Sequence, residues 1–286
     1  MEIFRVQLHR WHAVNIYINK PRYAKAGMIT SPHNPRLKLI RALAGKPKER
    51  REAGAFLAEG VRLVEEALSA GWPFLTVLYS AEISNRGSKL IEQLSAGGVE
   101  IEEVLPNLLR SAGETESSQG LVAVLKLPES SFQDDGPLSF VLIPDQIRDP
   151  GNLGTLIRSA AAAGAQFVFI PPETTDPFGP KVVRAGMGAH FRIKICSLGW
   201  DEIRASLSGV TTFLAGAEGQ ASCWDANFRQ PLALIVGGEA DGASQSARTL
   251  ANSVVNIPMP GKIESLNAGV AGSVLLFEVV RQRSEV

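Results

Sequence analysis

The sequence predicts an α/β protein that has a parallel sheet in its second half and a smaller α/β domain before it. Short apolar runs alternate with stretches of helical spacing through both halves, which is typical of strand–helix–strand units. The chain has 286 residues, enough for about two domains. Its 45% hydrophobic and 20% charged residues are typical of a globular protein with a packed core.

A polar, turn-rich stretch at 128–137 separates the two halves and is the predicted linker. We therefore expect a first domain over 28–127 and a second over 138–286. Residues 1–27 show no clean periodicity, and Met28 begins a segment that reads like a natural protein start. We expect 1–27 to be an N-terminal extension that is poorly ordered.

Glycines and apolar runs define the elements of the first domain. Gly71 ends one helical stretch and Gly97 another, and the strands are short apolar runs between such signals. In chain order we expect a helix at 36–43, a strand at 55–58, a helix at 60–70, a strand at 75–79, a helix at 88–96, a strand at 99–104, a short helix at 107–112 and a strand at 121–125.

The second domain opens with a largely apolar strand, as buried parallel strands do, and Gly164 ends the helix after it. We expect strands at 138–143, 167–170, 191–196, 211–215, 232–236 and 254–257. The expected helices are 153–163, 181–188, 200–207 and a long C-terminal one at 266–283.

Composition excludes several classes of protein. No stretch approaches the roughly 20 apolar residues of a membrane helix, and the N-terminus lacks the apolar run of a secretory signal. Two cysteines, Cys196 and Cys223, are too few for a metal cage, and the four histidines show no ligand spacing. These features predict a cytoplasmic, metal-free protein.

Three turns, each directly after an apolar strand, carry the candidate chemistry. The first is 144–154, where Pro and Gly fix a tight turn, Asn152 can cap the next helix and Arg158 follows on that helix. A capped turn with a solvated arginine explains the same pattern. Its glycines do not form the G-x-G-x-x-G dinucleotide fingerprint, which argues against a nicotinamide-dependent dehydrogenase.

The second turn is 237–242, where glycines let the backbone approach a ligand and Glu239 can accept from hydroxyl groups. A loop with a solvent-facing glutamate is the simpler alternative. The third turn is 257–267, whose prolines stiffen the chain and leave carbonyl groups free to accept hydrogen bonds. Ser265 and Asn267 read as N-cap residues of the final helix. Ligands of open α/β sheets lie at the carboxyl ends of strands, where these turns are.

Together and in this order, these turns resemble the SpoU (TrmH-like) class of the SPOUT RNA methyltransferases, over roughly 139–283. The first domain resembles the ribosomal-protein-like substrate-binding domain of that class. That likeness rests on the segments 29–31, 34–35, 50–51 and 56–60.

The resemblance implies transfer of a methyl group from S-adenosylmethionine to a ribose 2′-hydroxyl of RNA, and the extra leading domain favours ribosomal RNA. It also implies a homodimer and a deep trefoil knot, in which the third turn and C-terminal helix thread through an earlier loop. The positions that match the family's catalytic residues are Asn152, Arg158, Glu239, Ser265 and Asn267. Those that match its cofactor contacts are Leu214, Gly237, Ile257, Met259 and Leu266.

The family often gives the matching arginine the role of base. A guanidinium group is a poor proton acceptor, so we expect Arg158 to hold a phosphate or stabilise the developing alkoxide instead. Two departures from the family concern packing near the cofactor or the subunit interface. Gly186 stands where relatives often carry Ser, and Ala268-Gly269 stands where Val-Ser is usual.

The net charge of zero hides a basic leading segment, with twelve Lys and Arg against three Glu over residues 1–52. Such a segment can contact phosphates, although a solvated charged face gives the same composition. The candidates for RNA backbone contacts are Arg36, Lys38, Arg41, Lys46, Lys48, Arg50 and Arg51. Two alternatives stay open: a tRNA substrate, and a non-catalytic RNA-binding or assembly protein on the same scaffold.

Overall fold

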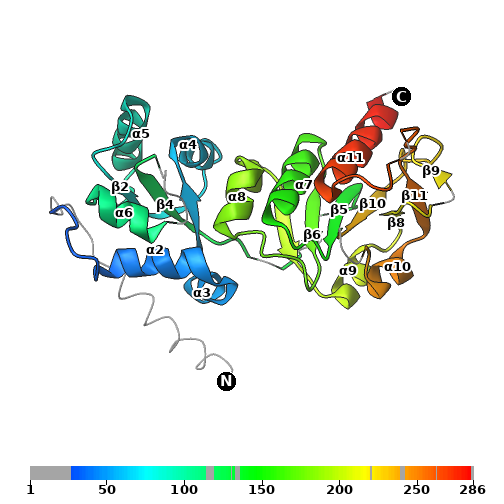
Figure 1. The fold of residues 1–286 in the computed structure, drawn as a ribbon, viewed down its shortest axis with the longest axis horizontal. Helices are drawn as coiled ribbons and strands as arrows, with labels where there is room; N and C mark the ends of the chain where they lie inside the picture. The colour runs from blue at the N-terminus through cyan, green and yellow to red at the C-terminus, as the bar shows by residue number, and fades with distance from the viewer. Residues whose placement is uncertain are drawn as a thin grey trace, which may run out of the picture. The chain divides into compact units, whose positions relative to one another are not determined.

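The computed structural model describes residues 27–113, 119–129, 131–132, 136–219, 221–238, 242–261 and 263–284. The chain divides into two compact units between Leu127 and Pro128 (Figure 1). Nearly all of the expected N-terminal extension, 1–26, lies outside the described residues. In the part of the chain that is described, no helix is both long and apolar enough to cross a membrane.

The first unit is a four-stranded sheet with helices on it. Its strand order is β1-β4-β2-β3, with β4 antiparallel to both neighbours and β2 parallel to β3. Its elements are α2 (Pro35–Gly45), α3 (Pro47–Ala53), β1 (Ala55–Glu59), α4 (Val61–Ser69), β2 (Phe74–Tyr79), α5 (Asn85–Ala96), β3 (Ile101–Glu103), α6 (Pro106–Ala112) and β4 (Leu121–Lys126).

The α3 helix was not expected from the sequence, because its residues are charged and have no apolar period. It forms because Pro47 begins it and Gly54 ends it in the left-handed conformation, at φ +59°. The core of this unit lies between α2 and the sheet, where Leu37 and Ile40 pack with Leu57 of β1.

The second unit is a seven-stranded sheet in the order β7-β6-β5-β10-β8-β11-β9, and all of these neighbours pair in parallel. Its elements are β5 (Phe140–Asp145), α7 (Pro150–Ala162), β6 (Phe167–Ile170), α8 (Pro180–Gly186), the 3-10 turn η1 (Ala189–Phe191), β7 (Lys194–Ser197), α9 (Trp200–Ser206), β8 (Thr211–Ala215), β9 (Ala221–Ser222), β10 (Leu232–Gly237), α10 (Gln245–Leu250), β11 (Ser253–Asn256) and α11 (Ala268–Ser284).

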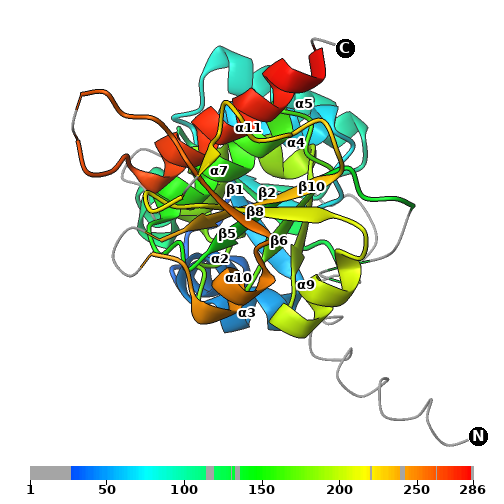
Figure 2. The ribbon, with the colours of Figure 1, turned by 90° about the vertical axis from the view of Figure 1, so that its right-hand side faces the viewer.

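Figure 2 shows α7 and α11 on one face of this sheet and α9 and α10 on the other. The central strands β5 and β10 are buried along most of their length, which explains their continuous apolar runs. Because the strands are parallel, the turns after β5, β8, β10 and β11 meet at one edge of the sheet. This edge carries the candidate site.

Polar contacts fasten the end of α11 to the start of the sheet. The Arg283 guanidinium donates to the carbonyls of Ser139 at 2.9 Å and Gln230 at 2.8 Å. It also lies 5.2 Å from the centre of the Phe140 ring. These contacts tie the C-terminal end of α11 to the residues that precede β5 and β10.

Candidate active site

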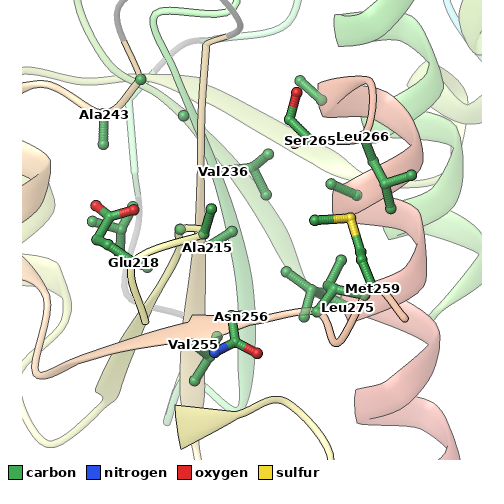
Figure 3. A pocket seen from close by; sticks show the side chains of 18 of the residues that line it. Ala215, Glu218, Val236, Ala243, Val255, Asn256, Met259, Ser265, Leu266 and Leu275 are labelled. Atoms are coloured by element: carbon green, nitrogen blue, oxygen red, sulfur yellow. The ribbon is translucent and has the colours of Figure 1, made fainter. Parts of the chain in front are cut away.

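A pocket of about 560 Å³ opens at the carboxyl ends of β8, β10 and β11 (Figure 3). Its walls are the segments 214–218, 236–238, 242–243, 255–259 and 263–266, together with side chains of α10 and α11. This volume is typical of a site for a small molecule or cofactor.

The five positions that match the family's cofactor contacts all line this one pocket. They are Leu214, Gly237, Ile257, Met259 and Leu266. Figure 3 shows Met259, Leu266 and Leu275 gathered on one side and Glu218 on the opposite side. The pocket therefore has an apolar wall and a charged wall.

Two glycines let the second turn approach its neighbours. A Cβ on Gly237 would stand 2.8 Å from the backbone nitrogen of Ala243, and one on Gly238 would stand 2.5 Å from the carbonyl oxygen of Gln146. The Gly238 amide donates to the Gly242 carbonyl at 3.1 Å and closes the turn. No larger residue fits at these two places without moving the backbone. Glu239 lies outside the described residues.

Asp145, whose role was not predicted from the sequence, fixes the backbone directly after the second turn. It ends β5 beside Gly237 of β10 and is fully buried. Its Oδ2 accepts a hydrogen bond of 2.6 Å from the backbone amide of Ser244, while its Oδ1 has no partner among the described residues. Burial raises the pKa of Asp145, and the Ser244 bond opposes that rise. The signal in the sequence was a carboxylate at the end of an otherwise apolar strand.

The first and third turns are joined by two asparagines. The Asn267 side-chain amide donates to Asn152 Oδ1 at 2.9 Å. Asn267 Oδ1 also accepts from the backbone amide of Val270 at 3.2 Å, so its predicted N-cap role is confirmed. The predicted cap role of Asn152 is wrong, because Asp149 caps α7 by accepting from the Asn152 amide at 2.8 Å. The Asn152 side chain reaches the third turn instead.

The first turn does not line the pocket, in contrast to the second and third turns. Among the described residues it approaches the pocket through the asparagine pair and through Gln146 behind Gly238. Arg158 is exposed on α7, and its guanidinium makes no hydrogen bond or ion pair with the described residues. Ser265 is exposed and lines the pocket, where the third turn leads into α11. Both side chains face solvent, and only Ser265 of the two lies in the lining of the pocket.

The structure separates the predicted RNA contacts of the first unit into two groups. Arg50 is buried, and its Nη1 donates to the carbonyl of Leu43 at 2.5 Å, so its prediction as an RNA contact is wrong. It ties α3 to the end of α2 instead. Arg36 is half-buried and forms ion pairs with Glu100 and Glu102, which neutralise much of its charge.

The other candidates lie at the surface. Arg41 is partly buried, and its guanidinium donates to the carbonyl of Pro32 at 2.9 Å. The exposed ones, on α2, on α3 and between the two helices, are Lys38, Lys46, Lys48 and Arg51. Within the described ranges, no cluster of three or more His, Cys, Asp or Glu side chains could hold a metal ion.

Two family models match the chain. Residues 139–277 match the SpoU rRNA Methylase family, and residues 34–123 match the MRM3-like substrate binding domain. A 23S rRNA (uridine(2479)-2′-O)-methyltransferase of Streptomyces viridochromogenes is 35% identical, over 92% of this chain and 94% of its own length. The 23S rRNA (guanosine(2553)-2′-O)-methyltransferase RlmP of Bacillus subtilis is 31% identical, over 88% of this chain and 98% of its own.

Solved structures of similar proteins agree with the family matches. An rRNA methyltransferase from Sinorhizobium meliloti superposes with a TM-score of 0.79 at 32% identity, and covers 90% of this chain and 98% of its own. The SpoU methyltransferase AviRb from Streptomyces viridochromogenes, in complex with the cofactor AdoMet, has a TM-score of 0.76 at 31% identity. That match covers 88% of this chain and 100% of AviRb. The strand-end pocket, its glycine turn and these matches over both units show that the chain belongs to the SpoU rRNA methylase family.

Proposed function

We propose that the protein transfers a methyl group from S-adenosylmethionine to a ribose 2′-hydroxyl of ribosomal RNA. One observation carries the proposal: the five positions that match the family's cofactor contacts converge on one pocket. Ribosomal RNA is favoured over tRNA because both relatives named above are 23S rRNA 2′-O-methyltransferases. Because these relatives are named as methyltransferases, they also favour an enzyme over a non-catalytic RNA-binding or assembly protein.

The pocket fits S-adenosylmethionine in size and in lining. Its apolar wall can take a flat adenine ring, and the carbonyls of the proline-stiffened segment 257–260 can accept from the adenine amino group. Gly237 presents only backbone to the pocket, and the turn behind it leaves no room for a Cβ. When bound, the cofactor supplies a methyl group that needs no further activation.

The chain must then orient the ribose hydroxyl and stabilise the charge that develops on its oxygen. We assign that charge stabilisation, or the grip on an adjacent phosphate, to the exposed guanidinium of Arg158. We assign the orientation of the hydroxyl to Asn152 and Ser265, and the support of Asn152 to Asn267 through their 2.9 Å hydrogen bond. Glu239 would fix the neighbouring geometry.

We also propose that the protein is a homodimer and that the third turn and α11 complete a trefoil knot. Val270 and Phe277 are large apolar side chains on α11 that are 48% and 50% exposed. They lie seven residues apart, so they share one face of the helix, and a second subunit would cover it. Because α7 packs beside α11, each subunit would then lie close to Arg158 of the other subunit.

Methyl transfer from labelled S-adenosylmethionine to ribosomal RNA tests the function. We expect Arg158→Ala to abolish transfer while cofactor binding, measured by calorimetry, stays intact. Arg204→Ala is the matched control, because among the described residues the Arg204 side chain forms only an exposed pair with Asp201 at 3.8 Å. Normal turnover by Arg158→Ala would refute the assignment. Mass-spectrometric mapping of ribose methylation in cells with and without the protein would identify the RNA, and a lost tRNA mark would refute the ribosomal substrate.

A further inference from the structure

The proposed cofactor carries charges that the apolar wall of the pocket does not match. Its methionine end has a carboxylate, an ammonium group and a sulfonium, whereas the five predicted cofactor positions are apolar residues or glycine. A charged group that leaves water without a partner costs far more than an apolar contact returns. The methionine end therefore needs polar or charged partners, and charged side chains of opposite sign are the strongest of these.

Three charged side chains line the pocket within the described residues: Glu218, Arg248 and Glu264. Two of them form an ion pair, with 2.7 Å between Arg248 Nη1 and Glu218 Oε1. Glu218 lies in the turn after β8 and Arg248 on α10, so the pair joins two walls of the pocket. The hydrogen bond from Arg248 lowers the pKa of Glu218 and keeps its carboxylate ionised.

The pair lies at the mouth of the pocket. The side chains of Arg248 and Glu218 are 43% and 57% exposed, whereas Leu214 and Leu275 in the same lining are buried. Figure 3 places Glu218 across the pocket from Met259 and Leu275. A ligand with one flat apolar end and one charged end would lie with the charged end toward Glu218 and Arg248.

We propose that this ion pair binds the methionine end of S-adenosylmethionine, with Arg248 on its α-carboxylate and Glu218 on its α-ammonium group. The inference rests on the proposed function. A zwitterion offers each member of the pair an opposite charge, and a guanidinium matches a carboxylate in two parallel hydrogen bonds. The ribose hydroxyls of the cofactor are neutral and offer no opposite charge to either side chain. They are therefore weaker partners for the ion pair than the methionine end is.

Three nucleosides test the proposal by calorimetry. S-adenosylmethionine and S-adenosylhomocysteine have the amino-acid end, and 5′-methylthioadenosine lacks it. We expect Arg248→Ala to weaken binding of the first two by about tenfold or more, the range for a lost hydrogen bond between charged groups. Binding of 5′-methylthioadenosine should change less than about twofold, which also shows that the variant pocket is folded. Glu218→Gln should show the same selectivity, and Arg204→Ala should leave all three affinities unchanged.

Two results would overturn this inference and leave the proposed function standing. An unchanged affinity of Arg248→Ala for S-adenosylmethionine would exclude the contact. An equal loss for 5′-methylthioadenosine would place the pair on the nucleoside or in the shape of the pocket. If the wild-type protein bound none of the three compounds, the proposed cofactor would be refuted and this inference with it.

Discussion

At the scale of single residues, the structure accounts for both departures from the family pattern. A Cβ on Gly186 would stand 2.5 Å from Cε1 of His190, so the buried imidazole occupies the place of the missing side chain. Gly269 lies against the asparagine pair, where a Cβ would stand 3.3 Å from Asn152 Oδ1. The first departure is compensated within the core, and the second leaves the site edge less crowded.

Replacing Gly186 with the family's serine should therefore destabilise this chain. We expect Gly186→Ser to lower the free energy of unfolding by about 1–3 kcal/mol, because the imidazole is buried and is held by its hydrogen bond to the Pro177 carbonyl. Urea unfolding measures the change. Gly45→Ser is the control, since a Cβ at Gly45 meets nothing within 4 Å. Equal effects of the two substitutions would contradict the explanation.

His190 should also make stability depend on pH. Burial lowers the pKa of His190 from 6.5 to about 4, and its Nε2 donates to the Pro177 carbonyl at 2.8 Å. The unfolded chain then binds more protons between these two values, so the contribution of this residue is complete above about pH 6.5 and is lost as the pH falls toward 4. We expect a loss of up to about 3 kcal/mol, measured by urea unfolding at several pH values. A His190→Gln variant that kept the same slope over this window would contradict the prediction.

At the scale of elements, the crossing of α7 and α11 positions the site. A Cβ on Gly272 would stand 2.2 Å from Cδ2 of Leu156 and 3.2 Å from Cγ2 of Val236, so the two helices and β10 pack tightly at this point. The hydroxyls of Ser159 and Ser273 also lie 2.7 Å apart across the crossing. The spacing of these helices sets whether Asn152 and Asn267 can meet.

A methyl group at this crossing should therefore reduce both stability and activity. We expect Gly272→Ala to lower the free energy of unfolding by about 1–3 kcal/mol and to slow methyl transfer, because α11 must move away from α7. Chemical unfolding and single-turnover kinetics measure the two effects. Adding Leu156→Ala should restore part of both. If the double variant lost more stability than the two single variants lose together, removal of the Leu156 side chain would not be making room for the new methyl group.

Neighbouring arginines of α3 should behave in opposite ways, because one is buried and the other exposed. We expect Arg51→Ala to weaken binding to ribosomal RNA. The slope of log affinity against log salt concentration should fall by the amount that corresponds to about one phosphate contact. Arg50→Ala should instead lower stability by about 2 kcal/mol, since it removes hydrogen bonds to the end of α2. Filter binding at several salt concentrations and chemical unfolding separate the two. An unchanged salt slope for Arg51→Ala would refute its proposed phosphate contact.

At the scale of the whole molecule, local patterns predicted what depends on local chemistry. The apolar runs of β5 and β10 and the glycines of the second turn indicated the site edge correctly, since parallel strand ends must meet. The polar helices α3 and α10 and the two-residue β9 were not predicted, because their residues have no apolar period. The burial of Arg50 and the Arg248–Glu218 pair were also missed. Charges that meet in space across a fold leave no periodic signal in the sequence.

The asparagine pair has a consequence for synthesis of the protein. Asn152 and Asn267 are separated by 115 residues, and the later one stands at the start of the final helix. A nascent chain therefore cannot join these two side chains until Asn267 has been made and has left the exit tunnel. The link between the first and third turns would thus form late, after most of the second unit has been synthesised.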